Sequence, residues 1–287
     1  MSSFNLTLSP SQVEFVLKPS VTIIQAYEVA NNSSQDIVLN TQILPWVPVG
    51  NDGSVSYQQA ATSSDLDFSL ANSDLKIGQS FILKANSKQQ IVLKIKTSKE
   101  ISLADYYQTF FVYQNQDPLN QDNNFSQATG KIGSHILLSV SNTENTSIKA
   151  KLESFKIFPK IKDVFFTPIT FSGEIKNDST YFFKTSGKII ITKNESPVKE
   201  IELNNDNVLT NHYRSFSCVD SCKLNSPLWP GKYQVTLKMD ENLGIADSSY
   251  SFYILPISPI LFVLFIVGII FGIQKIKKLK KQKINLK

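Results

Sequence analysis

The sequence predicts an all-β protein: two tandem immunoglobulin-like β-sandwiches followed by one transmembrane α-helix. Across residues 4–255, short segments of alternating apolar and polar residues are separated by Asn, Ser, Asp, Gly and Pro, a pattern typical of antiparallel sheets with one face in water. A change of composition at residues 141–147 (SNTENTS) indicates a linker. Residues 254–273 form an uncharged apolar run that is long enough to cross a bilayer.

These features predict the domain boundaries. We expect a first sandwich at residues 1–140, a linker at 141–147, a second sandwich at 148–253, the membrane helix at 254–274 and a basic tail at 275–287. The first segment contains about eight predicted strands and the second about seven, as in immunoglobulin-like domains. The clearest strand lies at residues 232–239, where Tyr233, Val235, Leu237 and Met239 alternate with polar residues.

The residues around the apolar run predict its orientation. The tail carries seven lysines and no acidic residue, and such a flank stays on the cytoplasmic side. We therefore expect a single-pass type I protein of the cell membrane, with its N-terminal region outside the cell. The expected anchors are an aromatic group at the outer interface and lysines at the inner one: Tyr250, Phe252, Tyr253, Lys275, Lys277, Lys278, Lys280 and Lys281.

The start of the helix is set by two prolines. Because Pro256 and Pro259 lie inside the apolar run, we expect Ser258 to cap the helix and Pro259 to occupy its first position.

Two other interpretations of the apolar run remain open. It could be a buried core helix, or the tail anchor of a cytoplasmic protein, although a tail anchor would place the lysines on the wrong side of the membrane. Residues 1–10 resemble no signal peptide, so we expect one that lies upstream, has been removed, or was missed in the choice of the start codon.

The charge of the chain excludes a nucleic-acid partner. The formal net charge of +5 includes the seven tail lysines, so the remaining residues carry a net charge of about −2. Before the tail there is one arginine, Arg214, and no basic stripe, whereas a protein that binds nucleic acid must neutralise phosphates.

Cys218 and Cys222, in the loop sequence CVDSC, are the two cysteines of the chain. Outside the cell their spacing permits a local disulfide, and two free thiols are the alternative. A zinc site would need two further ligands, and the chain has only two histidines, His135 and His212. We expect no metal and no cofactor.

The search for catalytic motifs finds neither a G-x-S-x-G nucleophile turn nor a phosphate-binding loop. We therefore expect a protein that is not an enzyme and has no catalytic residue. Two tryptophans that lie between prolines, Trp46 and Trp229, are candidates for stacking on a sugar ring. The alternative for each is that it closes the end of a sandwich.

The order of parts resembles that of the bacterial WxL-interacting proteins. The similarity lies in loose patterns of apolar and turn residues over nearly the whole chain, including LTLSPSQVEFVLKPSVTIIQAYEVANNSSQDIVL, GKIGSHILLSV, FSGEIKNDSTYFFKTSGKIIITK and LWPGKYQVTL. It implies a first domain that binds peptidoglycan and a second that binds surface or host proteins. The CVDSC loop and the missing signal peptide depart from the family pattern.

From these observations we expect a membrane-anchored adhesion protein of the bacterial cell surface, whose two sandwiches bind a cell-wall polymer or another surface protein. The alternative is a chaperone-like assembly factor for surface or pilus subunits that acts by strand complementation at an open sheet edge.

Overall fold

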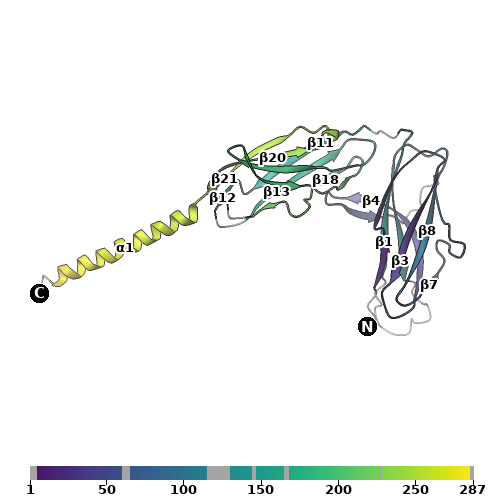
Figure 1. The fold of residues 1–287 in the computed structure, drawn as a ribbon, viewed down its shortest axis with the longest axis horizontal. Coiled ribbons are helices and arrows are strands. Elements are labelled where there is room, and N and C mark those ends of the chain that lie inside the picture. The colour runs from purple at the N-terminus through teal and green to yellow at the C-terminus, as the bar shows by residue number, and fades with distance from the viewer. Residues whose placement is uncertain are drawn as a thin grey trace. The chain divides into compact units, whose positions relative to one another are not determined.

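The computed structural model describes residues 5–59, 65–114, 130–143, 147–164, 168–225 and 228–284, and the side chains up to residue 277. Strands dominate the chain and one long helix ends it (Figure 1). The predicted class, two immunoglobulin-like β-sandwiches followed by one apolar helix, is confirmed.

The first sandwich consists of two sheets that enclose one core. One sheet has the order β1 (Leu6–Ser9), β3 (Thr22–Asn31), β8 (Ser87–Thr97) and β6 (Leu66–Leu70). The other has the order β2 (Gln12–Leu17), β10 (Lys131–Val140), β9 (Asp105–Gln114), β4 (Ile37–Val49) and β5 (Ser54–Tyr57), with β7 (Phe81–Leu83) paired to β4. Alternate residues of the central strands face inward and are buried, as the period of two requires.

The first strand of this sandwich is divided between the two sheets. After β1, a cis bond between Ser9 and Pro10 carries the chain across, so that β2 runs parallel to β10 in the other sheet. Neither β1 nor β2 pairs along the full length of the strand beside it. β1 pairs with β3 only from Glu28 to Asn31, and β2 pairs with β10 only from His135 to Val140.

The second sandwich repeats this plan. One sheet has the order β11 (Ala150–Phe158), β13 (Ile169–Asn177) and β18 (Tyr213–Ser215), with β19 (Lys223–Leu224) paired to β13. The other has the order β12 (Ile161–Asp163), β21 (Ser248–Leu255), β20 (Gly231–Met239), β15 (Gly187–Lys193) and β16 (Ser196–Glu202). A two-stranded ribbon, β14 (Phe183–Lys184) and β17 (Asn207–Val208), and a short 3-10 helix, η2 (Glu241–Leu243), complete it.

Strand β20 bears out the clearest sequence prediction. It spans Gly231–Met239, and its four predicted inward residues, Tyr233, Val235, Leu237 and Met239, are buried. β12 again follows a cis bond, between Phe158 and Pro159, and runs parallel to the last strand, β21.

The two compact units of the chain differ from the predicted domains. The first unit contains Met1–Ile148 together with Asn177–Phe183 and Leu209–His212, and the second contains the rest. Within the first unit, the carboxylate of Asp105 accepts hydrogen bonds from Tyr107 Oη (2.9 Å), Phe182 N (2.6 Å) and Thr210 Oγ1 (2.6 Å). Phe182 and Thr210, which the sequence pattern assigned to the second domain, are thus bonded to Asp105 within the first unit.

The helix α1 (Ile257–Ile284) begins later than the predicted membrane span. Ile254 and Leu255 still belong to β21, and Ile254 is buried opposite Gly231. Asp163 accepts hydrogen bonds from Ser258, whose backbone N lies 2.5 Å from Oδ2 and whose hydroxyl contacts Oδ1. A carboxylate at the first turn satisfies free N–H groups, so Asp163 caps the helix in the place expected for Ser258. The stretch Ile257–Lys277 is long and apolar enough to cross a membrane.

We expect the stability of the first sandwich to depend on pH through the buried phenol of Tyr27. The side chain is wholly buried and stacks on Phe110 at 5.0 Å, and burial raises the pKa of its phenol to about 12. Since the unfolded-state pKa is near 10, stability should be complete below about pH 10 and should fall by about 2 to 3 kcal/mol as the pH rises towards 12.

The measurement is urea unfolding below and within this pH window, for the wild type and for Tyr27→Phe. The variant cannot ionise at this position, so its alkaline loss of stability should be smaller. An equal loss in both proteins would contradict the assignment.

Candidate functional site: an uncovered sheet edge

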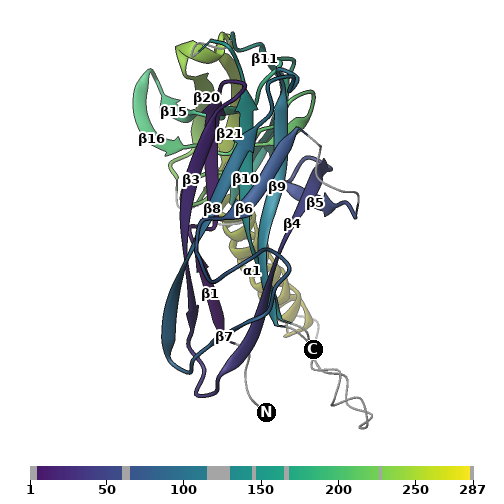
Figure 2. The same ribbon diagram turned by 90° about the vertical axis from the view of Figure 1, so that its right-hand side faces the viewer.

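The candidate binding feature of the first sandwich is the edge of β3 that β1 leaves uncovered. β3 pairs with β8 along its whole length, from Thr22 to Asn31, but with β1 only over its last four residues. Figure 2 shows β1 beside one end of β3 only. Among the strands that the structure describes, β8 is the one neighbour of residues 22–27. We call residues 22–27 the β3 edge.

The pairing pattern shows which backbone groups this edge presents. Thr97 N donates to Val21 O, and Asn32 N donates to Asn5 O. In an antiparallel ladder the direction of these groups alternates along the strand, so odd-numbered residues of β3 face β8 and even-numbered ones face the β1 side. Thr22, Ile24 and Ala26 therefore direct their N–H and C=O groups outward. The Gln25 side chain reaches Ala26 O at 2.6 Å.

The side chains of the β3 edge carry no charge. Its sequence is TIIQAY, and Ile24 is 64% exposed while Ile23 is half-buried against the core. Edge strands of soluble proteins are usually protected by charges, prolines or short length. The edge strand β16 of the second sandwich follows that rule, because Lys199, Glu200 and Glu202 lie along it and are exposed. An uncharged edge of six residues is instead suited to accept another strand.

A second uncovered edge lies at residues 131–134 of β10, before its pairing with β2 begins. It is shorter, and its backbone is crowded on one face. A Cβ at Gly133 would lie 2.6 Å from Thr109 Cγ2 and 2.8 Å from Phe111 Cε1, so only glycine fits there. The ammonium of Lys131 lies 3.8 Å from the ring centre of Phe111. Because of its length and lack of charge, the β3 edge is the stronger candidate.

The sequence predicts open sheet edges but not their positions. The available signal was the run of seven residues without charge, V-T-I-I-Q-A-Y, at residues 21–27. The register that leaves residues 22–27 uncovered depends on long-range pairing, which local patterns do not encode.

Trp46 does not offer a sugar-stacking surface. It lies within β4 rather than in a turn, and it is only 5% exposed. Its indole N–H donates to Gln108 O at 2.9 Å, and its ring contacts Tyr107 and His135 at centroid distances of 4.9 and 5.2 Å. Because so little of the ring is exposed, it cannot stack on a ligand, and Trp46 is a packing residue. Burial also lowers the pKa of His135.

Trp229 is placed differently, because it is 82% exposed just before β20. Its backbone oxygen accepts a hydrogen bond from the Tyr233 hydroxyl at 2.8 Å.

Cys218 and Cys222 form a disulfide, with their Cα atoms 5.1 Å apart. Among the described residues, no group of three or more His, Cys, Asp or Glu side chains could hold a metal ion.

The three aromatic residues expected at the outer membrane interface separate into different environments. Phe252 is wholly buried and stacks on Tyr233 at a centroid distance of 5.3 Å, so its assignment as an interface anchor is wrong. Tyr253 is exposed near the end of β21. Tyr250 lies three residues earlier, and its ring centroid is 5.8 Å from that of Phe155. Lys275 and Lys277 lie on α1, whereas the side chains of Lys278, Lys280 and Lys281 lie outside the described part.

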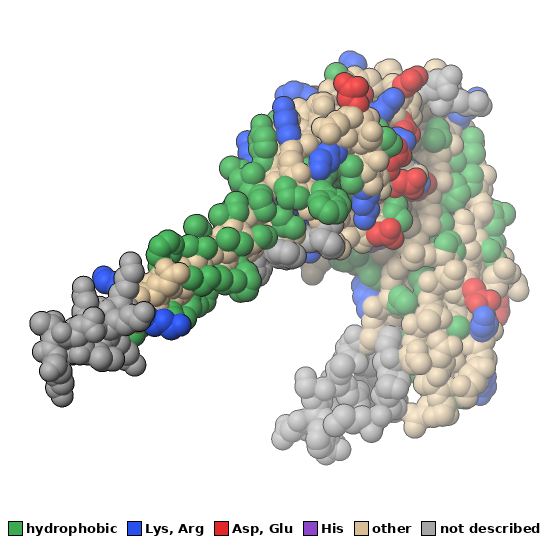
Figure 3. Space-filling view, turned by 60° about the vertical axis from the view of Figure 1, so that its left-hand side comes forward, with side chains coloured by type: hydrophobic (Ala, Val, Ile, Leu, Met, Phe, Trp, Pro, Cys, Tyr) green, Lys and Arg blue, Asp and Glu red, His purple; other side chains and the backbone are tan. Residues whose placement is uncertain are grey.

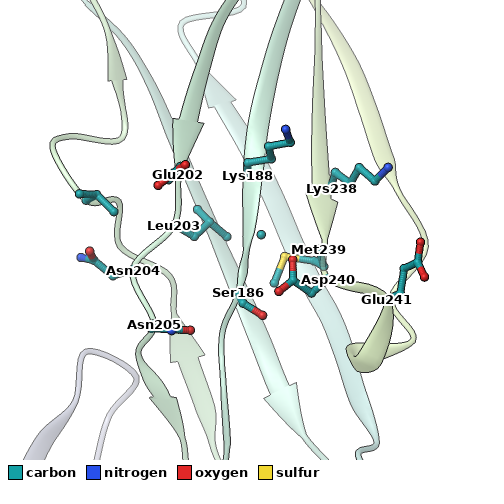
Figure 4. A pocket seen from close by; sticks show the side chains of 12 residues that line it. Ser186, Lys188, Glu202, Leu203, Asn204, Asn205, Lys238, Met239, Asp240 and Glu241 are labelled. Atoms are coloured by element: carbon teal, nitrogen blue, oxygen red, sulfur yellow. The ribbon is translucent and has the colours of Figure 1, made fainter.

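A polar hollow of about 600 Å³ lies at one end of the second sandwich (Figure 4). Residues from β15, β16, β20 and the adjoining loops line it. Ser186, Asn204, Asn205 and Asp240 supply its hydroxyl, amide and carboxylate groups, and Lys188 and Lys238 lie at its side. Such groups can form hydrogen bonds with a polar ligand.

The sequence matches no family model and no curated protein. Solved structures of fimbrial chaperones are similar to it in fold. The class 5 fimbriae chaperone CfaA matches over 88% of this chain and 100% of its own, with 12% identity and a TM-score of 0.42. The Escherichia coli chaperone DraB matches over 87% and 95%, with 12% identity and a TM-score of 0.39.

A third similar structure is the CsuC–CsuE chaperone–tip adhesion subunit complex of Acinetobacter baumannii, which matches over 88% of this chain and 99% of its own, with 11% identity and a TM-score of 0.39. The chain shares their immunoglobulin-like fold. Similarity of this degree concerns the fold alone.

Proposed function

We propose that this protein is a membrane-anchored binding protein whose first sandwich takes up an extended segment of another protein as an added strand on the β3 edge. The observation that carries the proposal is the uncovered, uncharged run of residues 22–27. An added strand would bond to the outward backbone groups of Thr22, Ile24 and Ala26. It would also cover Ile24, whose side chain is exposed.

This geometry favours broad recognition over recognition of one sequence. In strand addition, main-chain hydrogen bonds supply affinity and side-chain pockets supply specificity. Within the β3 edge, Ile24 is the large side chain that is most exposed. A site that depends mainly on backbone groups suits a chaperone-like assembly factor that meets several client segments, and this interpretation is preferred over permanent adhesion.

Membrane anchoring is part of the proposal. The stretch Ile257–Lys277 of α1 would cross the bilayer, with the lysine-rich tail in the cytoplasm and both sandwiches outside. Anchoring would keep the first sandwich tethered to the membrane across which secreted chains emerge. Membership of the WxL-interacting family stays a prediction from the sequence.

A second candidate function is the binding of a cell-wall polymer. The observation that favours it is the polar hollow beside Ser186, Asn204, Asn205 and Asp240, whose groups could bond to sugar hydroxyls. Retention of the full chain on purified peptidoglycan, and its loss in Asn205→Trp, would support this function.

Site-specific photo-crosslinking in cells tests the strand-addition function. A benzophenone amino acid replaces Ile24 on the β3 edge, and the matched control replaces Val198, which is exposed on the charged edge strand β16. We expect cross-links from position 24 to segments of secreted chains with alternating apolar residues, identified by mass spectrometry. Equal cross-linking from both positions would contradict the proposal.

A proline on the same edge tests the role of the backbone. The Ala26 N–H faces outward, so Ala26→Pro removes a donor to the added strand without breaking a bond to β8. We expect the cross-links from position 24 to fall at least about tenfold, since each 1.4 kcal/mol is a factor of ten. The control is Glu200→Pro on β16, which should leave them unchanged. Unaltered cross-linking in Ala26→Pro would show that no strand is added there.

A further inference from the structure

Five exposed apolar side chains gather at the end of the second sandwich that leads into α1. Trp229 and Phe158 are 82% and 75% exposed, although residues of this size are usually covered. The set, called the basal patch below, consists of Phe158, Ile161, Trp229, Tyr253 and Leu255. In Figure 3 the hydrophobic side chains along α1 continue onto the adjoining end of the sandwich.

Strand register places these residues at one end of the sandwich. Ile161 on β12 is paired with Tyr253 on β21, so both project from the same outer face, and Leu255 follows on that face one step closer to the helix. Trp229 lies two residues before Gly231, which is paired with Ile254. Phe158 ends β11 on the other sheet, and its backbone oxygen accepts a hydrogen bond from Thr170 at 3.0 Å.

The chain itself sets the distance from this patch to the apolar helix. Leu255 is separated from Ile257, the first residue of α1, by Pro256 alone. A strand advances about 3.3 Å per residue, so Leu255 lies within roughly 7 Å of the helix start. In addition, Asp163, the last residue of β12, bonds to Ser258. If α1 crosses a bilayer, the basal patch therefore lies at the level of its outer surface.

The charged residues near the patch suit a headgroup layer. Lys160 and Lys232 are exposed directly beside Ile161 and Tyr253, and Lys193 donates to Pro230 O at 3.0 Å. Glu195 is the exposed acidic residue in the adjacent turn. Lysines among aromatic and aliphatic side chains can keep their ammonium groups at lipid phosphates while the apolar parts enter the acyl region.

We propose that the basal patch docks on the lipid interface of the same membrane that α1 crosses, so that the second sandwich rests on the bilayer through Trp229, Phe158 and Ile161. The proposal rests on the membrane anchoring proposed above. Continuity with the apolar helix selects lipid as the occupant, because any molecule on the patch would have to share this level with the headgroups.

Tryptophan fluorescence of the full chain tests this docking. The chain has two tryptophans, and Trp46 is buried in the first sandwich, so the difference between the wild type and Trp229→Phe gives the emission of Trp229. Both proteins are placed in nanodiscs of phosphatidylcholine and phosphatidylglycerol, with or without bromine on the acyl chains near the headgroup. We expect blue-shifted Trp229 emission that is largely lost in the brominated nanodiscs.

The matched control moves the indole to the other end of the same sandwich. Val219 is exposed beside the polar hollow, so Trp229→Phe with Val219→Trp should give an emission that bromine leaves unchanged. Blue-shifted but unquenched Trp229 would indicate a protein partner or a second copy on the patch and would overturn the proposal, as would red-shifted, unquenched emission.

Insertion of α1 is measured separately, by co-migration with the nanodiscs and protection of the helix from protease. If α1 is inserted and Trp229 is not quenched, the docking is wrong while the anchor stands. If the chain stays outside the nanodiscs, the anchor is wrong and the docking falls with it.

Discussion

Replacing Phe252 with alanine is expected to destabilise the second sandwich by about 3 to 5 kcal/mol, the usual cost of removing a buried phenylalanine ring. Phe252 has no exposed surface, and its ring stacks on Tyr233 at an interplanar angle of 9°. Removal of the ring leaves a cavity in the core beneath β20 and β21, beside Tyr233. Urea unfolding of the full chain in detergent, followed by hydrogen exchange of the backbone amides of β20 and β21, measures the loss.

The control for this prediction is Tyr250→Ala on the same strand. Tyr250 is half-exposed, so its removal should cost about 1 kcal/mol or less, as for most surface substitutions. If Phe252 were instead an anchor at the membrane interface, Phe252→Ala would leave unfolding unchanged and would weaken membrane attachment. That result would contradict its assignment to the core.

Two lysines in the middle of α1 are expected to abolish membrane attachment. Phe265 and Ile266 lie near the centre of Ile257–Lys277, and each lysine at the centre of a spanning helix costs about 2.5 to 3.5 kcal/mol. The combined cost of about 6 kcal/mol should move the double variant Phe265→Lys, Ile266→Lys from the carbonate-resistant membrane fraction to the soluble fraction.

Ile276→Lys is the matched control, because Ile276 lies among the lysines at the far end of the helix. A lysine there can reach the headgroups, so this variant should remain in the membrane fraction. If the double variant also stayed there, α1 would not be a membrane-spanning helix.

Local alternation was enough to predict most of the strands. β20 shows why: Tyr233, Val235, Leu237 and Met239 recur with a period of two, and that period alone determines which face is buried. The same principle did not separate the roles of Phe252 and Tyr253. Both are aromatic residues just before the apolar run, but they project from opposite faces of β21, one into the core and one to the surface.

Tryptophans between prolines posed a similar problem. Pro45 and Pro48 suggested a turn around Trp46, yet all three residues lie in the 13-residue strand β4. Pairing with β9 and β5 held this segment extended in spite of its prolines, because tertiary contacts override local propensity. Trp229 also lies between two prolines, but it belongs to none of the strands that the structure describes, and it is exposed.

The sequence by itself determined the all-β class, the presence of two sandwiches and the apolar helix after them, since alternation, turn residues and a long apolar run are local properties. Only the tertiary structure decided which edge is open, which aromatic residues are buried and where β21 ends and α1 begins. Those features depend on pairing between distant segments, such as Thr7 with Ala30 and Gly231 with Ile254, and a shift of one residue in such pairing would exchange the buried and exposed faces.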